Sequence, residues 1–243
     1  MSNTETTEVR ISIYSCCIKR LLDILCALLT LIVFFWLFAL VALLVRINLG
    51  SPVVFKQPRP GKIDKKTGKE KIFTLYKFRT MTDGKDKDGN LLPDSERLTR
   101  FGKMLRATSL DELPEALNIL AGHMSVIGPR PQLVRDMVFM TDVQRRRHLV
   151  RPGLSGLAQV SGRNALEWDV KLSTDLEYIK KISFVEDFKI VLRTVYKCFR
   201  RDPDGKEIDL CEDYGDWLLH QNKIDEDYYQ KKQAEAKELL AQI

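Results

Sequence analysis

The sequence predicts a mostly helical α+β fold with one hydrophobic helix near the N-terminus, and three observations support this prediction. Residues 24–45 are almost wholly apolar. Only residues 52–55 and 72–81 have the apolar run, or the alternation of apolar and polar side chains, that is typical of strands. The rest of the body has helical patterns, separated by turns that contain glycine or proline, around residues 95–106, 109–121, 132–148 and 169–180.

The apolar run from Ile24 to Val45 is long enough to enter or cross a bilayer. Its 22 residues contain no charged side chain. In a helix they reach about 33 Å, against a hydrocarbon core of roughly 30 Å. The hydrophobic part of a signal peptide is shorter, and a buried helix of a soluble protein usually keeps a polar face. The run is therefore predicted to be a membrane helix.

Basic residues flank both ends of this helix. Lys19 and Arg20 precede it, and Arg46 and a series of lysines follow it. Because lysine and arginine prefer the cytoplasmic side, a helix that enters and leaves through one leaflet satisfies both ends, whereas a spanning helix satisfies only one. Charge alone leaves re-entry and spanning open. Asp23, one turn from the start of the run, is expected to pair with Lys19 or Arg20 at the membrane interface.

The net charge of +6 is unevenly distributed along the chain. From Asp202 onward there are five lysines and twelve acidic residues, so residues 1–201 carry a charge of +13. A basic body indicates anionic partners, which are nucleotide phosphates, an anionic bilayer or nucleic acid. No recognised nucleic-acid motif is present, which argues against the last of these. The five cysteines lack metal-ligand spacing and fit a reducing compartment.

These patterns divide the chain into four parts, namely an N-terminal segment at residues 1–18, a membrane helix at 19–49, the body at 50–201 and an acidic appendage at 202–243. Within the body, a turn at residues 58–61 and a charged loop at residues 62–71 are expected between the two strands. The appendage contains a predicted helix at residues 226–240. We interpret it as a partner contact or a solvated tail.

The stretch from residue 178 to residue 201 predicts a basic amphipathic helix. Apolar side chains recur at three- and four-residue steps, from Ile179 and Ile182 to Val195 and Phe199, and lysines and arginines occupy much of the remainder. Such a helix either packs against the core or lies in an anionic membrane interface. The pattern leaves both interpretations open.

Several arginines lie in loops bracketed by glycine or proline. Loops held by a scaffold are where binding residues concentrate, and the planar guanidinium group matches phosphate oxygens. Any one of these arginines alone is more typical of a surface or salt-bridge residue. Together they predict a polyphosphate site without a glycine-rich phosphate loop, and its candidate members are Arg106, Arg130, Arg151 and Arg163.

The adjacent carboxylates Asp111 and Glu112 have two interpretations. Ser109 and Glu112 have the spacing of a helix capping box, which would make the acidic pair structural. Pro114 favours a helix that begins later, and this would leave both carboxylates free just before it. A carboxylate in that position, surrounded by arginines, could bind Mg²⁺ or attack phosphorus.

Taken together, these motifs resemble the bacterial sugar transferase family, the monotopic phosphoglycosyl transferases, in their minimal single-helix form. The matching motifs occur in order from about residue 19 to residue 200. They are KRLLD (19–23), QPRPG (57–61), YKFRTM (76–81), LTRFG (98–102), SLDELP (109–114), NIL-x-G-x-MS (118–125), VIGPRP (126–131) and RPGLSGLAQVSGRN (151–164).

The resemblance implies that residues 50–201 are a catalytic domain on the cytoplasmic face of the bacterial inner membrane. It implies transfer of a sugar-1-phosphate from a UDP-sugar to polyprenyl phosphate, with release of UMP, as the first membrane step of glycoconjugate assembly. Asp111 would attack the β-phosphorus, and Glu112 would join it in holding Mg²⁺. The residues that would bind the diphosphate and nucleotide are Lys77, Arg79, Arg106, Arg130, Gln159 and Arg163.

Two positions depart from the family pattern. Small members often break the membrane helix with Ser-Pro, and Phe35-Trp36 stands at that place here, although the resemblance still favours re-entry. Leu157 replaces a frequent tryptophan.

Two alternatives to this mechanism and function are considered. In the first, the lipid attacks the UDP-sugar directly and Asp111 is only a metal ligand. In the second, the protein is a membrane-tethered scaffold that binds anionic lipid. The identity of the sugar and the presence of a homodimer are left open.

Overall fold

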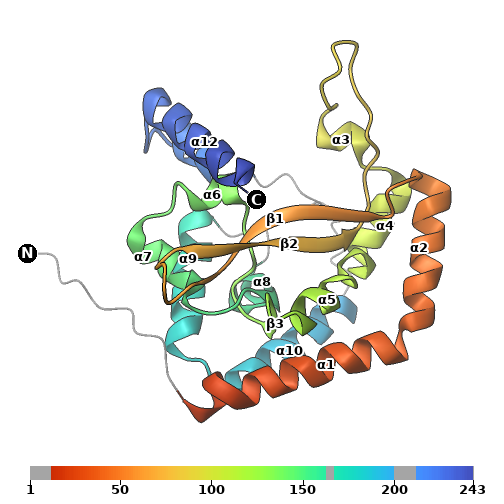
Figure 1. The fold of residues 1–243 in the computed structure, drawn as a ribbon, viewed down its shortest axis with the longest axis vertical. Helices are drawn as coiled ribbons and strands as arrows, with labels where there is room; N and C mark the ends of the chain where they lie inside the picture. Colours follow the sequence, from red (N-terminus) through yellow and green to blue (C-terminus); the bar gives the residue numbers. More distant parts are fainter. Residues whose placement is uncertain (1–11, 163–166, 200–211, 243) are drawn as a thin grey trace, which may run out of the picture.

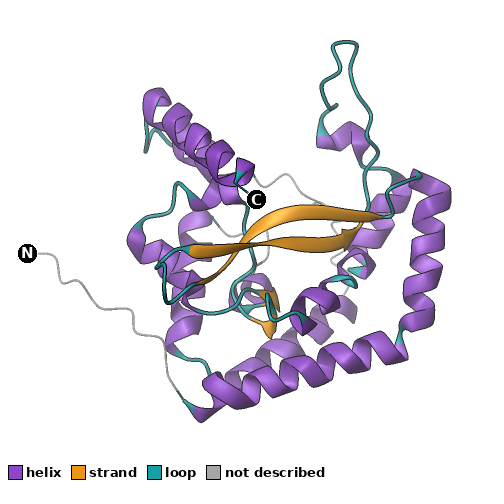
Figure 2. Cartoon of the chain, in the orientation of Figure 1, coloured by secondary structure: helices purple, strands orange, loops and turns teal. Residues whose placement is uncertain are grey.

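The computed structural model describes residues 12–162, 167–199 and 212–242 of the chain. Helices surround a long two-stranded hairpin (Figure 1, Figure 2), which confirms the predicted mostly helical α+β fold. The shorter helices and helical turns of the body are α3 (Asp94–Arg97), α4 (Arg100–Ala107), η2 (Leu110–Glu112), α5 (Glu115–Leu120), α6 (Val134–Met137), α7 (Asp142–Arg145), η3 (Arg146–Leu149) and α8 (Leu157–Ser161).

The main sheet is an antiparallel hairpin of β1 (Val54–Ile63) and β2 (Glu70–Phe78). The prediction of a turn at residues 58–61 is wrong, because β1 continues through Pro58 and Pro60 to Ile63. This strand has a partner on one side only, and prolines are tolerated on such an edge strand. The expected charged loop is correspondingly short, since only residues 64–69 connect the two strands.

A second, unpredicted sheet joins two distant segments of the body. β3 (Ser125–Ile127) and β4 (Gly153–Ser155) pair in parallel, with Ser125 opposite Gly153. A Cβ atom at Gly153 would lie 2.0 Å from the backbone nitrogen of Gly128, so this close approach requires glycine. The pair brings the segment after β3 beside the segment after β4, and both segments contain predicted site residues.

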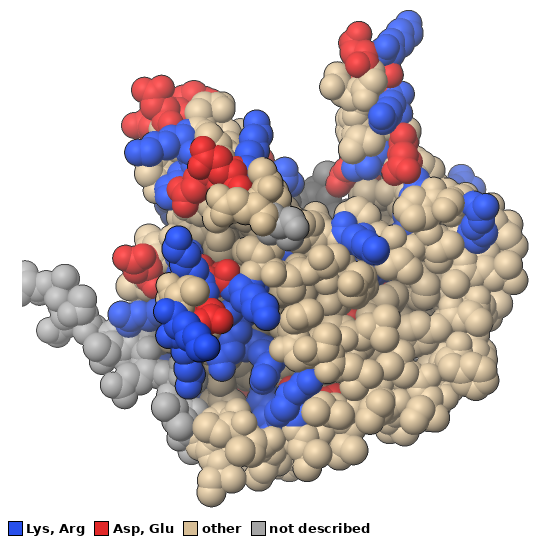
Figure 3. Space-filling model, viewed as in Figure 1, with Lys and Arg blue, Asp and Glu red and all other residues tan. Residues whose placement is uncertain are grey.

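The predicted membrane helix consists of two helices, α1 (Lys19–Val33) and α2 (Phe35–Leu49), with a bend of 66°. Within the described residues, no single helix is long and apolar enough to cross a bilayer. The bent pair Tyr14–Val33 and Phe35–Leu49 meets that criterion by length and composition alone. Its outward side chains form a broad apolar surface (Figure 3), and the exposed ones include Leu21, Leu25, Leu29, Ile32, Phe35, Trp36, Leu40, Leu43 and Ile47.

The bend lies at Phe34, where the sequence has no proline or glycine. Phe34 leaves helical geometry, with φ −104° and ψ 14°. One turn earlier, the Thr30 hydroxyl donates a hydrogen bond of 2.8 Å to the Cys26 carbonyl, an arrangement that often bends helices. In addition, the two halves pack on different parts of the body. Ala27 of α1 joins the core near α5, and Val41 of α2 joins a separate core near α4, so a straight helix could not make both contacts.

The helix predicted at residues 169–180 is α9 (Trp168–Lys180). The predicted amphipathic helix at 178–201 is interrupted after α9 and continues as α10 (Phe184–Phe199). The η1 turn (Tyr14–Ile18) packs near these helices. Ile179, Ile182 and Ile190 are buried in the core. The opposite face of α10 leaves five large apolar side chains about half exposed, and these are Phe184, Val185, Phe188, Leu192 and Val195. One face therefore packs on the core, while the other presents an apolar surface.

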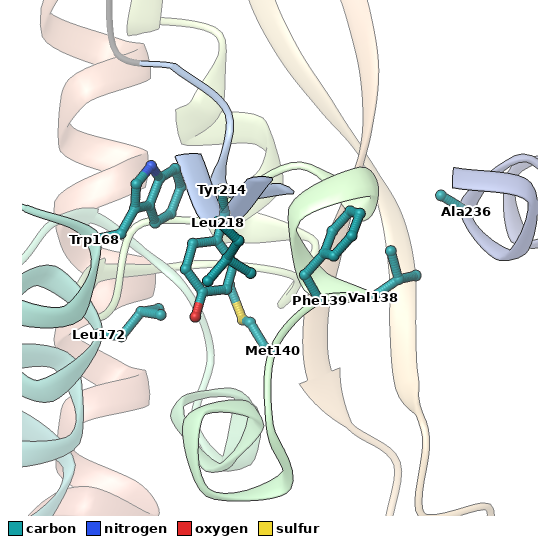
Figure 4. Packing of buried hydrophobic residues seen from close by; sticks show 8 residues of the cluster. All are labelled: Val138, Phe139, Met140, Trp168, Leu172, Tyr214, Leu218 and Ala236. Atoms are coloured by element: carbon teal, nitrogen blue, oxygen red, sulfur yellow. The ribbon is translucent and has the colours of Figure 1, made fainter. Parts of the chain in front are cut away.

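The appendage forms two helices, α11 (Tyr214–His220) and α12 (Glu226–Ala241), which confirms the predicted helix at 226–240 and adds an unpredicted one. Its described part is not a solvated tail, because Tyr214 and Leu218 pack against Phe139, Trp168 and other core residues (Figure 4). The acidic stretch from residue 204 to residue 211 lies outside the described residues. Residues 212–242 thus contribute Tyr214, Leu218 and Ala236 to the body's core.

Candidate active site

The two predicted carboxylates lie on a short helical turn between α4 and α5. Ser109, which precedes η2, has a left-handed backbone with φ 55°, and its side chain makes no capping hydrogen bond. The capping-box interpretation is therefore wrong. α5 begins after Pro114, as the alternative predicted. The left-handed residue and the proline together hold Asp111 and Glu112 outside any longer helix.

Asp111 is a buried carboxylate, only 7% exposed. Its pKa is raised to about 6, mainly by burial and also by the charge of Glu112. The charges of Lys77, Arg106 and Arg130 oppose this increase. Among the described residues, no side chain donates a hydrogen bond to this carboxylate. The group is thus desolvated, surrounded by cations and unrestrained by hydrogen bonds, which is the environment of a reactive carboxylate.

Glu112 has a different environment from its neighbour. Its Oε1 atom accepts hydrogen bonds from Lys77 Nζ at 2.8 Å and from Arg130 Nη2 at 3.0 Å. Burial alone would raise its pKa, but the charges of Arg130 and Lys77 hold the pKa below its usual range. Glu112 therefore stays ionised and connects two of the predicted phosphate-binding cations.

Glu115 is a third carboxylate in the site, and the sequence analysis did not assign it. It is 3% exposed, and its Oε1 lies 3.2 Å from Lys77 Nζ. Burial raises its pKa above the usual range, against the opposing charge of Lys77. Its position three residues after Glu112 was a usable signal, but an acidic residue directly after Pro114 is also typical of an ordinary first helical turn.

The predicted arginines differ in whether they lie near the site carboxylates. Arg106 donates a hydrogen bond from Nε to Thr80 Oγ1 at 3.0 Å, and its charge lowers the pKa of Asp111. Arg79 instead donates to the carbonyls of Ser51 and Met81, both at 2.8 Å, and forms an ion pair with Asp83. Its guanidinium group therefore fixes the end of β2, and none of the three site carboxylates is its partner.

Gln159 is on α8, which follows β4. Its Nε2 donates to the Leu154 carbonyl at 3.0 Å, and its Oε1 is buried without a hydrogen-bond partner in the described part of the chain. That atom is an unused acceptor within the described residues, and it is covered by the protein. Arg163 lies outside the described residues.

The predicted interface residues do not pair with one another. Lys19 forms an ion pair with Asp187 of α10. Arg20 donates to the carbonyls of Ile119 and Leu120, at 2.6 and 2.9 Å. Asp23 is buried and accepts from Ser125 Oγ at 2.9 Å and from the Val126 backbone nitrogen at 2.8 Å. The expected pairing of Asp23 with a neighbouring cation is therefore wrong, because all three residues attach α1 to the body.

The carboxylates offer limited means to hold a metal ion. Within the described residues, no group of three or more His, Cys, Asp or Glu side chains is arranged to hold one. Mg²⁺ is nevertheless often bound by one or two carboxylates together with substrate phosphates and water. The oxygen donors of Asp111 and Glu112 fit that chemistry when phosphate oxygens complete the ligand set.

Comparisons with known proteins agree with this site. Residues 14–201 match the family model described as bacterial sugar transferase. The chain is 47% identical over 180 residues to the uncharacterized sugar transferase EpsL of Bacillus subtilis, covering 74% of this chain and 86% of that protein. It is 38% identical over 192 residues to the exopolysaccharide production protein PSS of Rhizobium leguminosarum, covering 73% of this chain and 93% of that protein.

A longer relative has a name that states its substrates. The chain is 39% identical over 191 residues to a UDP-glucose:undecaprenyl-phosphate glucose-1-phosphate transferase of Klebsiella pneumoniae. This match covers 74% of the chain and 40% of that protein. The resemblance found in the sequence motifs is thereby confirmed.

Proposed function

The chain belongs to the bacterial sugar transferase family, and on that premise we propose that it transfers a sugar-1-phosphate from a UDP-sugar to polyprenyl phosphate. The products are polyprenyl-diphosphate-sugar and UMP. The Klebsiella pneumoniae relative is named for the same exchange with UDP-glucose and undecaprenyl phosphate. The observation that carries the proposal is Asp111, a buried carboxylate with no hydrogen bond from the described residues and with several cations nearby.

The reaction proceeds in two displacements at phosphorus. In the first, an Asp111 oxygen forms a bond to the β-phosphorus of the UDP-sugar, the bond from that phosphorus to the bridging oxygen breaks, and UMP leaves. In the second, a phosphate oxygen of the lipid attacks the same phosphorus and the Asp111 oxygen leaves. A carboxylate without hydrogen-bond donors is a better nucleophile than a solvated one, and this favours Asp111 over Glu112 as the attacking group.

The cations around the site supply the charge neutralisation that phosphoryl transfer needs. Lys77 and Arg130 are held together by Glu112, and Arg106 lies close to Asp111. When bound, Mg²⁺ would add positive charge against the diphosphate oxygens, with Asp111 and Glu112 as the residues that hold it. Gln159 Oε1, buried without a partner among the described residues, would accept a hydrogen bond from the nucleotide once its side chain turns toward the site.

A lipid acceptor is consistent with the apolar surfaces of the molecule. The bent pair α1–α2 and the outer face of α10 both expose large apolar side chains. A re-entrant helix in the cytoplasmic leaflet of the inner membrane, with α10 at its surface, would shield these side chains from water. It would also keep Lys19 and Arg46 on the cytoplasmic side, which the distribution of basic residues favours.

The test is the intact mass of the protein in nanodiscs after incubation with a panel of UDP-sugars and Mg²⁺, without lipid acceptor. We expect a mass gain equal to one sugar phosphate with the correct donor. Asp111→Asn should show no gain, while Asp88→Asn, a change in an exposed loop, should behave like the unaltered protein.

Two other outcomes lead to different conclusions. Release of UMP that requires the lipid acceptor, without any protein adduct, would show direct attack by the lipid and leave Asp111 as a metal ligand. Neither adduct nor UMP across the panel would overturn the transferase proposal and favour the membrane-tethered scaffold.

A further inference from the structure

The loop that carries Arg130 is held through its backbone at four consecutive residues. The Gly128 nitrogen donates to the Ser155 carbonyl at 2.8 Å, and the Pro129 carbonyl accepts from the Gly153 nitrogen at 3.0 Å. These two bonds extend the β3–β4 pairing. The next two carbonyls, of Arg130 and Pro131, accept from side chains of other elements.

Arg147 of η3 holds the first of these carbonyls. Its Nη2 donates to the Arg130 carbonyl at 2.6 Å, and the same guanidinium group forms two hydrogen bonds with Asp175 Oδ2, at 2.9 and 2.6 Å. Arg147 is 1% exposed and Asp175 3%, so this is a buried ion pair. Such a pair is weak evidence for stability, because burial of two charges offsets much of their attraction. Its contact with the Arg130 carbonyl suggests another role.

Arg59 of β1 holds the second carbonyl from a different direction. Its Nη1 donates to the Pro131 carbonyl at 3.1 Å, and its Nη2 donates to Gln57 Oε1 at 2.6 Å. Burial, together with the nearby charge of Arg130, lowers the pKa of Arg59 to about 10. A cation is thus kept in a desolvated position close to another cation, and the contacts it makes there are with the loop and with Gln57.

We infer that Arg147 and Arg59 are positioning residues that clamp the backbone of residues 130 and 131, so that the Arg130 side chain is directed at Glu112 and the site. The inference deepens the proposed function and rests on it. The Arg130 side chain is 46% exposed and reaches Glu112 Oε1, at 3.0 Å, from this loop. The clamp fixes the point from which that side chain extends, and misplacement by about 1 Å can reduce an enzymatic rate by as much as 100-fold.

The test is a double-mutant cycle on acceptor-dependent UMP release, with kcat and KM for the UDP-sugar measured separately. One change is the pair Arg147→Met with Asp175→Leu, which removes the buried ion pair without leaving an unpaired charge. The other is Arg130→Ala. We expect the first change to reduce kcat/KM by about 10- to 100-fold, and to reduce it less than 2-fold when Arg130 is already alanine.

Three further variants keep the test decisive. Arg59→Met should likewise lose its effect in the Arg130→Ala background. If the double change does not fold, Arg147→Lys is used in its place, because it keeps a positive charge opposite Asp175. Arg145→Met is the matched control, because Arg145 lies near Arg147 but forms its ion pair with Glu70, outside the loop, and it should leave kcat/KM within 2-fold.

An equal loss of kcat/KM in both backgrounds would overturn the inference, since it would show that Arg147 acts independently of Arg130. The same conclusion would follow if kcat/KM fell only in proportion to the folded fraction measured by thermal unfolding. Failure of the proposed function is distinguishable, because the unaltered protein would then release no UMP.

Discussion

The helical pairs at the two ends of the described chain are attached to the body in opposite ways. The N-terminal pair α1–α2 begins with polar anchors, in which Lys19, Arg20 and Asp23 bind groups of the body, and it exposes apolar side chains. The C-terminal pair α11–α12 buries Tyr214 and Leu218 and presents charged side chains outward (Figure 3).

The difference indicates that the two pairs are adapted to different surroundings. Water favours burial of apolar surface, and the C-terminal pair follows that rule. An extended apolar surface is unfavourable in water, whereas buried polar anchors are most valuable where no water competes for them. The arrangement of the N-terminal pair therefore fits apolar surroundings. Four predictions test this contrast, in order of their expected effect on the free energy of unfolding.

The largest effect is expected from Asp23→Leu, which removes a polar anchor of α1. The change leaves the Ser125 hydroxyl and the Val126 N–H without their acceptor. Because hydrogen bonds to a charged group contribute roughly 1.5–3 kcal/mol each, we expect a loss of about 3–5 kcal/mol. Chemical denaturation in detergent micelles measures this loss. Asp23→Asn, which keeps one acceptor oxygen, should lose less, and a loss below about 1 kcal/mol for the leucine variant would contradict the anchoring role.

Gly215→Val should disturb the apolar contact of the C-terminal pair. A Cβ atom at Gly215 would lie 2.4 Å from the Phe139 ring. Overpacking of this kind costs about 1–3 kcal/mol, so we expect a loss of about 2 kcal/mol and faster proteolysis of residues 212–242. Ala234→Val, on the exposed side of α12, is the control and should change stability by about 0.5 kcal/mol or less. Equal losses of stability in the two variants would show that the contact with the Phe139 ring does not limit the side chain at position 215.

The contact of the C-terminal pair contains one buried carboxylate whose titration should be measurable. Asp136 accepts from the backbone nitrogens of Tyr214 and Leu133, at 3.0 and 3.1 Å, and burial raises its pKa to about 6. Because the folded-state pKa is above the unfolded value, the stability due to this group is present below about pH 4 and is lost as pH rises through about 6.

The expected decrease is about 2 kcal/mol between pH 4 and pH 7, at 1.36 kcal/mol for each pKa unit. Denaturation of the unaltered protein and of Asp136→Asn across this range measures it. The asparagine variant should show a smaller decrease, and parallel profiles for the two proteins would rule out Asp136 as the titrating group.

The smallest change in the free energy of unfolding is expected for Ile32→Glu. The same variant should show the clearest change in binding to lipid vesicles. The Ile32 side chain is 69% exposed on α1, so the folded protein in detergent should lose about 0.5 kcal/mol or less. A charge in a membrane-embedded helix costs roughly 2.5–3.5 kcal/mol, so binding to sedimented lipid vesicles should fall by on the order of 100-fold. Leu240→Glu on α12 is the control and should leave binding unchanged. Equal binding of both variants would place α1 outside the bilayer.

Features set by local sequence were predictable. The alternation that marks β2, the helical patterns of α9 and α12 and the start of α5 after Pro114 depend on residues within one or two turns of each other. Asp111 and Glu112, the two carboxylates of the candidate site, could be identified as a pair. The difference between their environments could not be predicted, because the hydrogen bonds to Glu112 come from Lys77 and Arg130, which are distant in the sequence.

Features set by tertiary contact were not predictable from these patterns. β3 and β4 have three residues each, too few for a periodicity, and they exist because distant segments meet. The bend at Phe34 has no proline and follows from two separate cores. Arg79, which the resemblance assigned to phosphate binding, donates to the Ser51 carbonyl, which becomes its neighbour only after folding.

The burial of Trp168 and Phe139 against α11 and α12 also has a consequence for biosynthesis. Translation delivers the apolar pair α1–α2 first, so a membrane can take it up while the remainder is still being made. Tyr214 and Leu218, which pack with Trp168, are synthesised later than this ring. At roughly 5–20 residues per second, the ring of Trp168 waits several seconds while the approximately 50 residues up to Leu218 are made. During that interval the apolar surface around Trp168 is exposed, so shielding of this surface lowers the risk of aggregation.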